Sequence, residues 1–310
     1  MRIVVTGGAG FIGANLTRAL LHAGDAVVVV DDFSTGRRGN LHGLDVMLLE
    51  GSVLDRTILD KAMVDADAVV HLAALPSVPR SIKDPVASHH ANATGTLEVL
   101  EAVRRAGSPH VVVASSSSVF GANPELPKHE DMRVAPMSPY AVSKLATEAY
   151  ALAFARCYGL DVLAFRFFNV FGPLQPAGHA YAAVIPAFID AAVAGRPLPL
   201  QGDGSQSRDF TFVGSVGSVL TDAVHRRVTC EQAINLAFGG RTTLAELIAM
   251  LEQELGHAVS VDSQPPRPGD VPHSQADAGR LRAMFPDVEP VSLEEGLRAT
   301  VVWFRETDHS

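Results

Sequence analysis

The stretch that decides the fold is Thr6-Gly7-Gly8-Ala9-Gly10-Phe11-Ile12-Gly13. An apolar run precedes it and an amphipathic run follows it, so the pattern predicts a strand, a glycine turn and a helix. Gly7 permits a tight turn, Gly10 lets backbone approach an anion closely, and Gly13 lets the helix pack on the strand. An anion bound at this turn would meet the N–H groups at the start of the helix.

A second apolar strand, at 26–30, ends in Asp31. A carboxylate about 20 residues after a glycine turn suits the ribose hydroxyls of a dinucleotide. Arg37 and Arg38 follow and have the charge to hold a 2′-phosphate, but Asp31 would repel it. The sequence therefore predicts a dinucleotide site that prefers NAD to NADP.

Strands and helices alternate through the first half of the chain. Several of the strands are apolar throughout, as is typical of parallel strands that are covered on both faces. The pattern predicts an α/β fold with a doubly wound parallel sheet of the Rossmann type, and ligands then bind at the carboxyl ends of the strands. The strands are expected near 2–6, 26–30, 45–49, 67–72, 109–114 and 161–166, and the helices near 11–23, 55–64, 84–106 and 138–158.

The pattern loosens after residue 168, where proline and glycine cluster in several loops. We expect two parts: a dinucleotide-binding domain at 1–168, and a smaller α/β substrate lobe at 169–310, with chain crossovers between them. In the second part helices fit 182–194, 214–226, 243–256 and 292–306, and short strands fit 198–200, 210–213 and 233–236.

The amino-acid composition indicates the class of protein and limits the kinds of partner that it can bind. The 310 residues are 47% apolar and 19% charged, which is typical of a globular protein with a large core. The formal net charge of −9 argues against nucleic acid or an anionic membrane as a partner. Cys157 and Cys230 are too few for a disulfide framework, and we expect buried free thiols in a reducing compartment. Met1 runs directly into the first strand, and no apolar stretch is long enough to span a bilayer, so we expect a cytoplasmic protein.

Two polar groups fall where a doubly wound sheet places its chemistry. Four serines, 115–118, follow the predicted strand at 109–114 and therefore lie at a carboxyl end. Tyr140 and Lys144 are at positions i and i+4 of a predicted helix, so both side chains lie on one face. A neighbouring ammonium favours the phenolate and is expected to lower the pKa of Tyr140, as a general base near neutral pH requires.

With these motifs the sequence resembles an extended short-chain dehydrogenase/reductase of the nucleotide-sugar epimerase and dehydratase group. Within that group it is most similar to the UDP-hexose and UDP-N-acetylhexosamine 4-epimerases. The resemblance covers nearly the whole chain and is also carried by the stretches Leu75–Ser81, Phe165–Asn169, Tyr181–Pro186, Gly202–Phe210, Gly239–Leu244 and Arg267–Asp270.

The resemblance implies NAD-dependent 4-epimerisation of a UDP-sugar through a transient 4-keto sugar. It implies Tyr140 as the base, Lys144 as its partner and Ser116 as an assisting hydroxyl. The cofactor-binding residues that it implies are Gly7, Gly10, Phe11, Ile12, Gly13, Asp31, Asp32, Ser34, Thr35, Gly36, Ser52, Val53, Leu72, Ala73, Ala74, Asn92, Ser115, Tyr140, Lys144 and Phe167. The substrate-binding residues are Ser77, Val78, Ser116, Ser117, Tyr140, Asn169, Val184, Phe188, Gln201, Arg208, Arg267, Asp270 and Ser274, among which Asn169, Arg208 and Arg267 would hold the diphosphate and Phe188 and Gln201 would flank the uridine.

Two positions bear on the sugar. Dehydratases of the group generally carry an acidic residue in the loop that here is Ser116 to Val119, and this loop has only hydroxyls. Ser274 stands where epimerases confined to plain hexoses tend to have a bulky aromatic residue, so we expect room for a 2-acetamido group, with UDP-GlcNAc and UDP-GalNAc as substrates, alone or beside UDP-Glc and UDP-Gal. Ser52 and Ser215 replace acidic residues that are common in the group.

Alternatives remain open at this point. A UDP-glucuronate 4-epimerase or a nucleotide-sugar dehydratase would use the same scaffold, and a dinucleotide sensor without catalysis is a third possibility. The resemblance implies a homodimer that pairs the helices at 84–106 and 138–158 in a four-helix bundle. His71 ends a buried strand and is expected to be a hydrogen-bonded core residue, and the sequence predicts no metal site.

Overall fold

The protein is described by a computed structural model that covers residues 1–177, 183–265 and 272–307. The chain divides into two compact units. The first comprises Met1–Asn123, Glu130–Phe167 and Val216–Leu236, and the second comprises Pro124–His129, Phe168–Ser215 and Ala237–Ser310. The prediction divided the chain at 168/169 and expected crossovers without locating them; in the structure 124–129 belong to the second unit and 216–236 return to the first.

The first unit is built on a seven-stranded parallel sheet in the order β11-β6-β5-β4-β1-β2-β3. Every expected strand of the first half is present within a few residues. The strands are β1 (Arg2–Thr6), β2 (Ala26–Asp31), β3 (Met47–Glu50), β4 (Ala68–His71), β5 (His110–Ser116), β6 (Val162–Phe167) and β11 (Ile234–Leu236). This doubly wound order confirms the predicted fold class.

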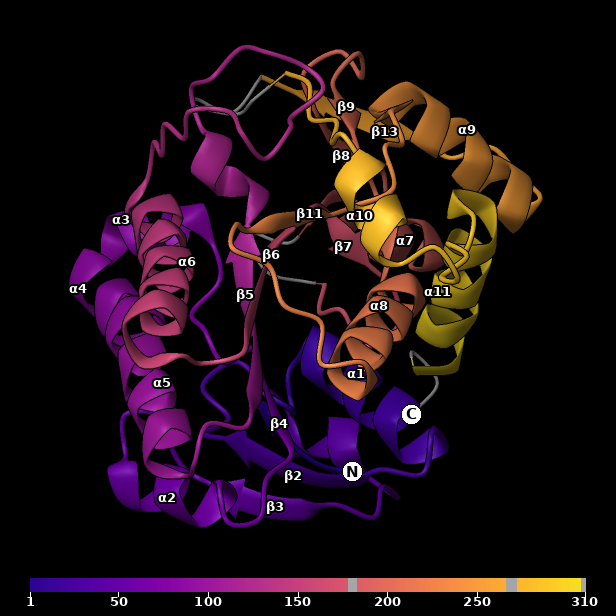
Figure 1. Cartoon of the computed structure of the whole chain (residues 1–310). Helices are drawn as coiled ribbons and strands as arrows, with labels where there is room; N and C mark the ends of the chain where they lie inside the picture. Colours follow the sequence, from indigo (N-terminus) through magenta and orange to yellow (C-terminus); the bar gives the residue numbers. More distant parts are fainter. Residues whose placement is uncertain (178–182, 266–271, 308–310) are drawn as a thin grey trace. The chain divides into compact units, whose positions relative to one another are not determined.

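Helices cover both faces of this sheet (Figure 1). In the figure, α5 and α6 lie on one side of the sheet, and α1 and α8 lie on the other. The helices of the unit are α1 (Phe11–His22), α2 (Arg56–Ala62), α3 (Val78–Lys83), α4 (Pro85–His89), α5 (Gly95–Arg105), α6 (Pro139–Tyr158) and most of α8 (Val213–His225), with 3-10 turns η1 (Arg38–Leu41) and η3 (Ser117–Phe120).

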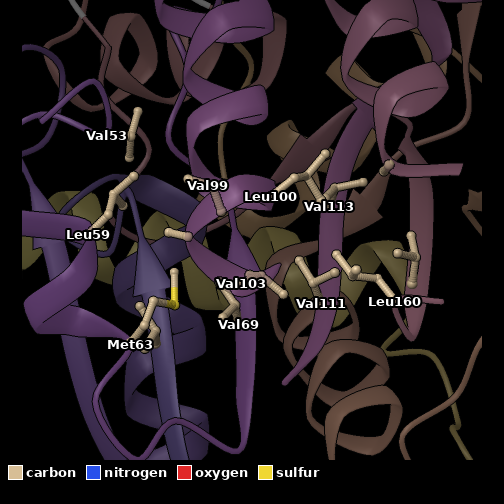
Figure 2. Packing of buried hydrophobic residues seen from close by; sticks show 14 of the residues in the cluster. Val53, Leu59, Met63, Val69, Val99, Leu100, Val103, Val111, Val113 and Leu160 are labelled. Atoms are coloured by element: carbon tan, nitrogen blue, oxygen red, sulfur yellow. The ribbon is translucent and has the colours of Figure 1, made fainter. Parts of the chain in front are cut away.

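The core of the first unit is aliphatic because its strands are covered on both faces. Figure 2 shows Val69 and Val111 of neighbouring strands packed against Val99 and Val103 of α5. These four side chains are essentially inaccessible to water. Burial of each contributes about 1.5–3 kcal/mol relative to exposure. The sheet that carries the expected site is therefore a rigid support.

One expected helix is interrupted. The stretch 84–106 forms α4 and α5, but a π-helical turn, η2 (His90–Thr94), separates them. Such a turn adds a residue to the helix and often marks a functional position. Here the turn contains Asn92, which is 1% exposed.

The second unit consists of small sheets and helices. Its strands pair as β7 with β10, β8 with β13, and β9 with β12. The elements are β7 (Val170–Phe171), α7 (Val184–Val193), β8 (Leu198–Gln201), β9 (Ser207–Arg208), β10 (Thr211–Phe212), β12 (Thr242–Thr243), α9 (Leu244–Leu255), β13 (Val261–Gln264), α10 (Gly279–Met284) and α11 (Leu293–Thr307).

The two cysteines correct one expectation. Cys157 is exposed and Cys230 is half-buried, although both were expected to be buried. Cys157 lies in the last turn of α6, just before Gly159 ends that helix in a left-handed conformation. Apolar neighbours in the sequence do not bury a side chain that lies on the outer face of a helix end. Both thiols are free, and no helix within the described residues is long and apolar enough to cross a membrane.

Candidate active site

The glycine turn follows β1 and is closely packed. Gly7 has a φ of +71°, and a Cβ there would lie 2.7 Å from the backbone nitrogen of Ala73. A Cβ at Gly13 would lie 2.1 Å from the Gly7 carbonyl oxygen. Gly10 is the N-cap of α1 and supplies no side-chain acceptor. The turn is thus a cradle without side chains at the N-terminus of a helix, and it fits the pyrophosphate of NAD.

Asp31 lies beside this turn at the carboxyl end of β2. Its carboxylate accepts hydrogen bonds from the N–H groups of Ala9 and Phe33, both at 2.8 Å. Burial raises the pKa of Asp31, and those two bonds oppose the rise. Arg38 forms an ion pair with Glu50, and its guanidinium lies 4.4 Å from the centre of the Phe33 ring. Arg38 is thus engaged by the protein, and a fixed carboxylate at the ribose position suits NAD.

The loop after β4 contacts the same turn. Leu72 N–H bonds the Thr6 carbonyl at 3.0 Å, and Ala73 N–H bonds the Thr6 hydroxyl at 3.3 Å. Ser52 accepts a hydrogen bond from Leu54 N–H, which is a local turn contact. Val53 is buried in the core of the unit. The predicted cofactor-binding residues that follow β1, β3 and β4 therefore all belong to the first unit.

Asn92, which the resemblance implies as a cofactor-binding residue, has its side chain bonded within the first unit. The amide is buried, its oxygen accepts from Leu75 N–H at 2.7 Å, and its nitrogen donates to Leu75 O at 3.2 Å and to the Ser143 hydroxyl at 2.9 Å. The side chain therefore holds the loop after β4 against α6.

Ser116, Tyr140 and Lys144 come together in the first unit. α6 begins at Pro139, and the Ser138 hydroxyl caps it by accepting from Ala141 N–H at 3.1 Å. The Ser116 hydroxyl at the end of β5 donates to the Ser118 hydroxyl at 3.0 Å and, as a hydrogen-bonding neighbour, acts to lower the pKa of the Tyr140 phenol. Lys144, one turn further along, donates its ammonium to Ala114 O at 2.8 Å. The phenol, a hydroxyl and an ammonium group thus meet at a carboxyl end of the sheet.

The direction of the Tyr140 pKa shift corrects the prediction made from the Tyr140–Lys144 spacing. Burial raises the pKa of the phenol, because the phenolate loses solvation, and the bond with Ser116 only partly offsets this. Burial also lowers the pKa of Lys144 to about 8. In the protein alone, desolvation therefore outweighs the attraction between phenolate and ammonium on which the prediction rested.

Ser115 faces a buried ion pair. Its hydroxyl donates to Glu148 at 3.0 Å and to the Lys144 carbonyl at 3.2 Å. Glu148 binds Arg166 of β6 through two bonds, of 2.6 and 3.0 Å. Sequence reasoning missed both charged residues. Glu148 is at i+4 from Lys144, and Arg166 interrupts an apolar strand, so these two signals were present in the sequence.

The second unit gathers three of the predicted substrate-binding residues. Asn169 donates its amide to Asp209 O at 3.0 Å. Arg208 donates to the carbonyls of Ser207 and Pro272, at 3.0 and 3.1 Å. Ser274 N–H bonds Ser207 O at 3.0 Å. The segments that carry Asn169, Arg208 and Ser274 are thus bonded into one cluster.

Asp209 stabilises this cluster. Its side chain is buried and accepts from the N–H groups of Gly239 at 3.2 Å and Ala276 at 3.0 Å. Burial raises the pKa of this carboxyl to about 7. Arg208 is the residue implied to hold the diphosphate, whereas its neighbour Asp209 is buried and bonds backbone N–H groups of the second unit.

The remaining predicted substrate-binding residues lie on different elements and differ in how deeply they are buried. Phe188 of α7 is 1% exposed and belongs to the core of the second unit, where Val184 packs at its edge. Gln201 hydrogen-bonds Gln264 across the β8–β13 pair. Ser77 caps α3 with a φ of 102°, and Val78 after it is exposed. Arg267 and Asp270 lie outside the described residues.

The sheet, the glycine turn and the Ser116–Tyr140–Lys144 group together define a nicotinamide-dinucleotide enzyme of the short-chain type. The profile of the NAD dependent epimerase/dehydratase family matches residues 3–237. The chain belongs to this family of NAD-dependent enzymes.

Three similar proteins have related activities. The chain is 38% identical to a UDP-glucose 4-epimerase of Mycolicibacterium smegmatis, over 98% of this chain and 99% of that one. It is 36% identical to the UDP-N-acetylglucosamine 4-epimerase of Methanobrevibacter ruminantium, solved with UDP-N-acetylmuramic acid, with a TM-score of 0.93 over 99% and 98% of the two chains. It is 29% identical to the UDP-glucuronic acid 4-epimerase of Bacillus cereus, solved with UDP-glucuronic acid and NAD, with a TM-score of 0.91 over 99% and 100%.

Proposed function

We propose that the protein catalyses the NAD-dependent 4-epimerisation of a UDP-sugar. The observation that carries the proposal is the grouping of three side chains: Ser116 is the hydrogen-bonding neighbour of the Tyr140 phenol, and Lys144 lies one helical turn away. These groups lie in the same unit as the glycine turn, which fits NAD. The two relatives at 38% and 36% identity are named as UDP-sugar 4-epimerases, which supports the same reaction here.

Each residue of this group has a defined task. Tyr140 takes the proton of the sugar 4-hydroxyl, and the Ser116 hydroxyl bonds the same oxygen and stabilises the charge that develops there. Lys144 is the cation that offsets the cost of ionising a buried phenol. NAD, which the glycine turn and Asp31 would hold, would supply the hydride acceptor for carbon 4 and the hydride donor for the opposite face of the 4-keto sugar. The proton on Tyr140 then goes back to the sugar oxygen, so the enzyme and cofactor end unchanged.

The diphosphate keeps the 4-keto sugar bound while it turns. In the second unit, Asn169 and Arg208 are the candidates for this contact, because both lie in the cluster that Asp209 holds together. Binding energy from a part of the substrate remote from carbon 4 keeps the intermediate in the site.

N-acetylated UDP-sugars are the substrates that we favour. Ser274 is a small, half-buried residue whose N–H bonds the Ser207 carbonyl, and a side chain of this size is compatible with a neighbouring 2-acetamido group. A UDP-glucuronate epimerase is the second candidate, supported by the similarity to the Bacillus cereus enzyme. A dehydratase is less favoured, because the loop of η3 presents serine hydroxyls and no carboxyl.

We also propose a homodimer through the helices of the first unit. Several apolar side chains are exposed on α3, α4 and α6, among them Ile82 at 65%, Val86 at 64% and Val142 at 52%. Exposed apolar patches of this kind are typical of protein interfaces. Sedimentation of the wild type and of Val142→Glu tests the interface, and a wild-type monomer contradicts it.

Incubation with UDP-Glc, UDP-GlcNAc and UDP-GlcA separately, followed by NMR of the anomeric protons, tests the function. New 4-epimer signals at unchanged mass are expected with at least one donor. Tyr140→Phe should abolish them while NAD remains bound, because it removes only the proton acceptor. A product lighter by one water identifies a dehydratase. Bound NAD without any change of the three donors contradicts the proposal.

A further inference from the structure

His71 is the last residue of β4, and the proposed mechanism does not use it. It is 3% exposed, and it pairs in register with Thr6 of β1. Its Nδ1 lies 2.7 Å from the Thr6 hydroxyl, and its Nε2 lies 3.1 Å from the hydroxyl of Thr96 in α5. The imidazole therefore bridges the strand before the glycine turn and a helix on one face of the sheet.

The neighbouring bonds fix where the imidazole carries its proton. The Thr6 hydroxyl accepts from Ala73 N–H, so its own proton is available to His71 Nδ1. The Thr96 hydroxyl donates to Asn92 O at 2.6 Å, so it accepts from His71 Nε2–H. The network thus assigns a neutral ring with its proton on Nε2. Burial lowers the pKa of His71 to about 3, and the positive charge of Lys144 adds a smaller contribution in the same direction. The low pKa agrees with a neutral ring.

The network continues to α6 through the π-helical turn η2. Asn92 O in that turn accepts from Thr96 and also from the Thr147 hydroxyl of α6, at 3.3 Å. The Asn92 amide holds both backbone groups of Leu75 and donates to Ser143, whose hydroxyl donates to Tyr140 O at 2.8 Å. The loop after β4 and the helix that carries Tyr140 are therefore joined through one directed set of bonds.

We propose that His71 is a positioning residue, which fixes the loop Leu72–Leu75 relative to α6 and so sets the place of the Tyr140 phenol beside the cofactor. The inference rests on the proposed function for its kinetic test. A ring with one acceptor and one donor at opposite ends allows a single arrangement of the neighbouring hydroxyls, and a fully satisfied buried network is rigid. Proton and hydride transfer require such alignment, since a displacement of about 1 Å costs about 100-fold in rate.

Thr96→Val tests the network, with Thr17→Val as its matched control. Both threonines are completely buried, but the Thr17 hydroxyl has no hydrogen-bond partner among the described residues. Thr96→Val should lower kcat by about 10-fold to 100-fold and change KM for the UDP-sugar by less than about twofold, because alignment is lost and substrate contacts are kept. Thr17→Val should leave both constants near wild type.

A second set of variants distinguishes a positioning role of His71 from a general effect on the stability of the fold. His71→Gln keeps a donor at the ε position toward Thr96 and should recover most of the kcat that His71→Phe loses. His110→Gln measures the cost of changing another buried histidine, since within the described part of the chain the His110 ring bonds the Val228 carbonyl through Nε2 and its Nδ1 has no partner. If Thr96→Val lowers the melting temperature but has the kcat of Thr17→Val, the network is structural only and the proposal is wrong.

NMR of the imidazole nitrogens tests the network without any activity. His71 should show a protonated Nε2 and an unprotonated Nδ1 from pH 5 to pH 8. A ring protonated on Nδ1, or one that titrates in that range, overturns the proposal even when the enzyme is active. If the wild type turns over no UDP-sugar, the proposed function fails. The role of His71 is then tested by two other results. A ring protonated on Nε2, together with faster release of NAD from Thr96→Val than from Thr17→Val, supports the proposal.

Discussion

The buried Glu148–Arg166 pair gives the sharpest test of how the first unit is held together. Both side chains are 7% exposed, and Glu148 binds Arg166 twice and Ser115 once. Glu148→Leu leaves the guanidinium buried without its carboxylate. The loss of one partner of a buried pair costs about 3–5 kcal/mol in free energy of unfolding. For 310 residues that corresponds to a fall of about 5–8 °C in the melting temperature.

The double variant provides the decisive comparison. Glu148→Leu with Arg166→Met replaces the ion pair by apolar side chains of similar volume, and such replacement is often neutral or stabilising. We therefore expect the double variant to regain most of the stability that each single variant loses. The exposed pair Arg56–Glu98, in which Arg56 is 71% exposed, is the control, and its coupling energy should be much smaller than that of the buried pair because solvent screens it.

Urea unfolding gives the free energy of unfolding of the wild type, the single variants and the double variant for each ion pair. NAD is held at one concentration and the series is repeated without it, because a bound cofactor stabilises the folded state by mass action. The reasoning is refuted if Glu148→Leu costs less than about 1 kcal/mol, which is the range of an exposed pair. It is also refuted if the losses of the two single variants simply add in the double variant, because additivity means that the residues do not interact.

Three further predictions concern ligands and pH. If Ser274 has its proposed place, Ser274→Tyr should lower kcat/KM for UDP-GlcNAc at least about 10-fold more than for UDP-Glc, because the ring would fill the space proposed for the 2-acetamido group; equal losses contradict this. Asp31→Ala should weaken NAD binding by about 1–3 kcal/mol and NADP binding less, as measured by fluorescence titration; equal weakening of both would count against the ribose contact. Asp209 has a folded pKa of about 7 against 3.8 for the ordinary carboxyl, so the folded state holds the extra proton and stability should fall as pH rises from about 4 to about 7. Asp209→Asn should flatten that slope in urea midpoints, and an unchanged slope would show that Asp209 is not its source.

Much of the first unit could be predicted because its signals are local. The glycine turn, the apolar strands and Asp31 follow one another in the sequence, and each needs only its neighbours to be recognised. The Tyr140–Lys144 spacing likewise fixes a shared helix face. His71 was expected to be a hydrogen-bonded core residue, and its two bonds and its burial confirm that.

The missed features depend on partners far away in the chain. The π-helical turn at Asn92 forms around the backbone of Leu75 and hydroxyls of α6, which helical periodicity cannot reveal. The raised pKa of Tyr140 follows from burial, which the i+4 spacing does not report. Phe188, expected to flank the uridine, lies in the core cluster of the second unit; its role toward the uridine stays a prediction, because an aromatic residue on an apolar helix face suits either place.

The return of the chain to the first unit at 216–236 has a consequence for folding during synthesis. β11 pairs with β6 in parallel, with Ile234 opposite Phe165, so this edge strand comes from a segment that is translated much later. Until residue 236 has left the ribosome, β6 presents an unpaired edge, and open edges invite wrong pairing. A fragment that stops at residue 168 would therefore lack one strand of its sheet, and we expect it to aggregate.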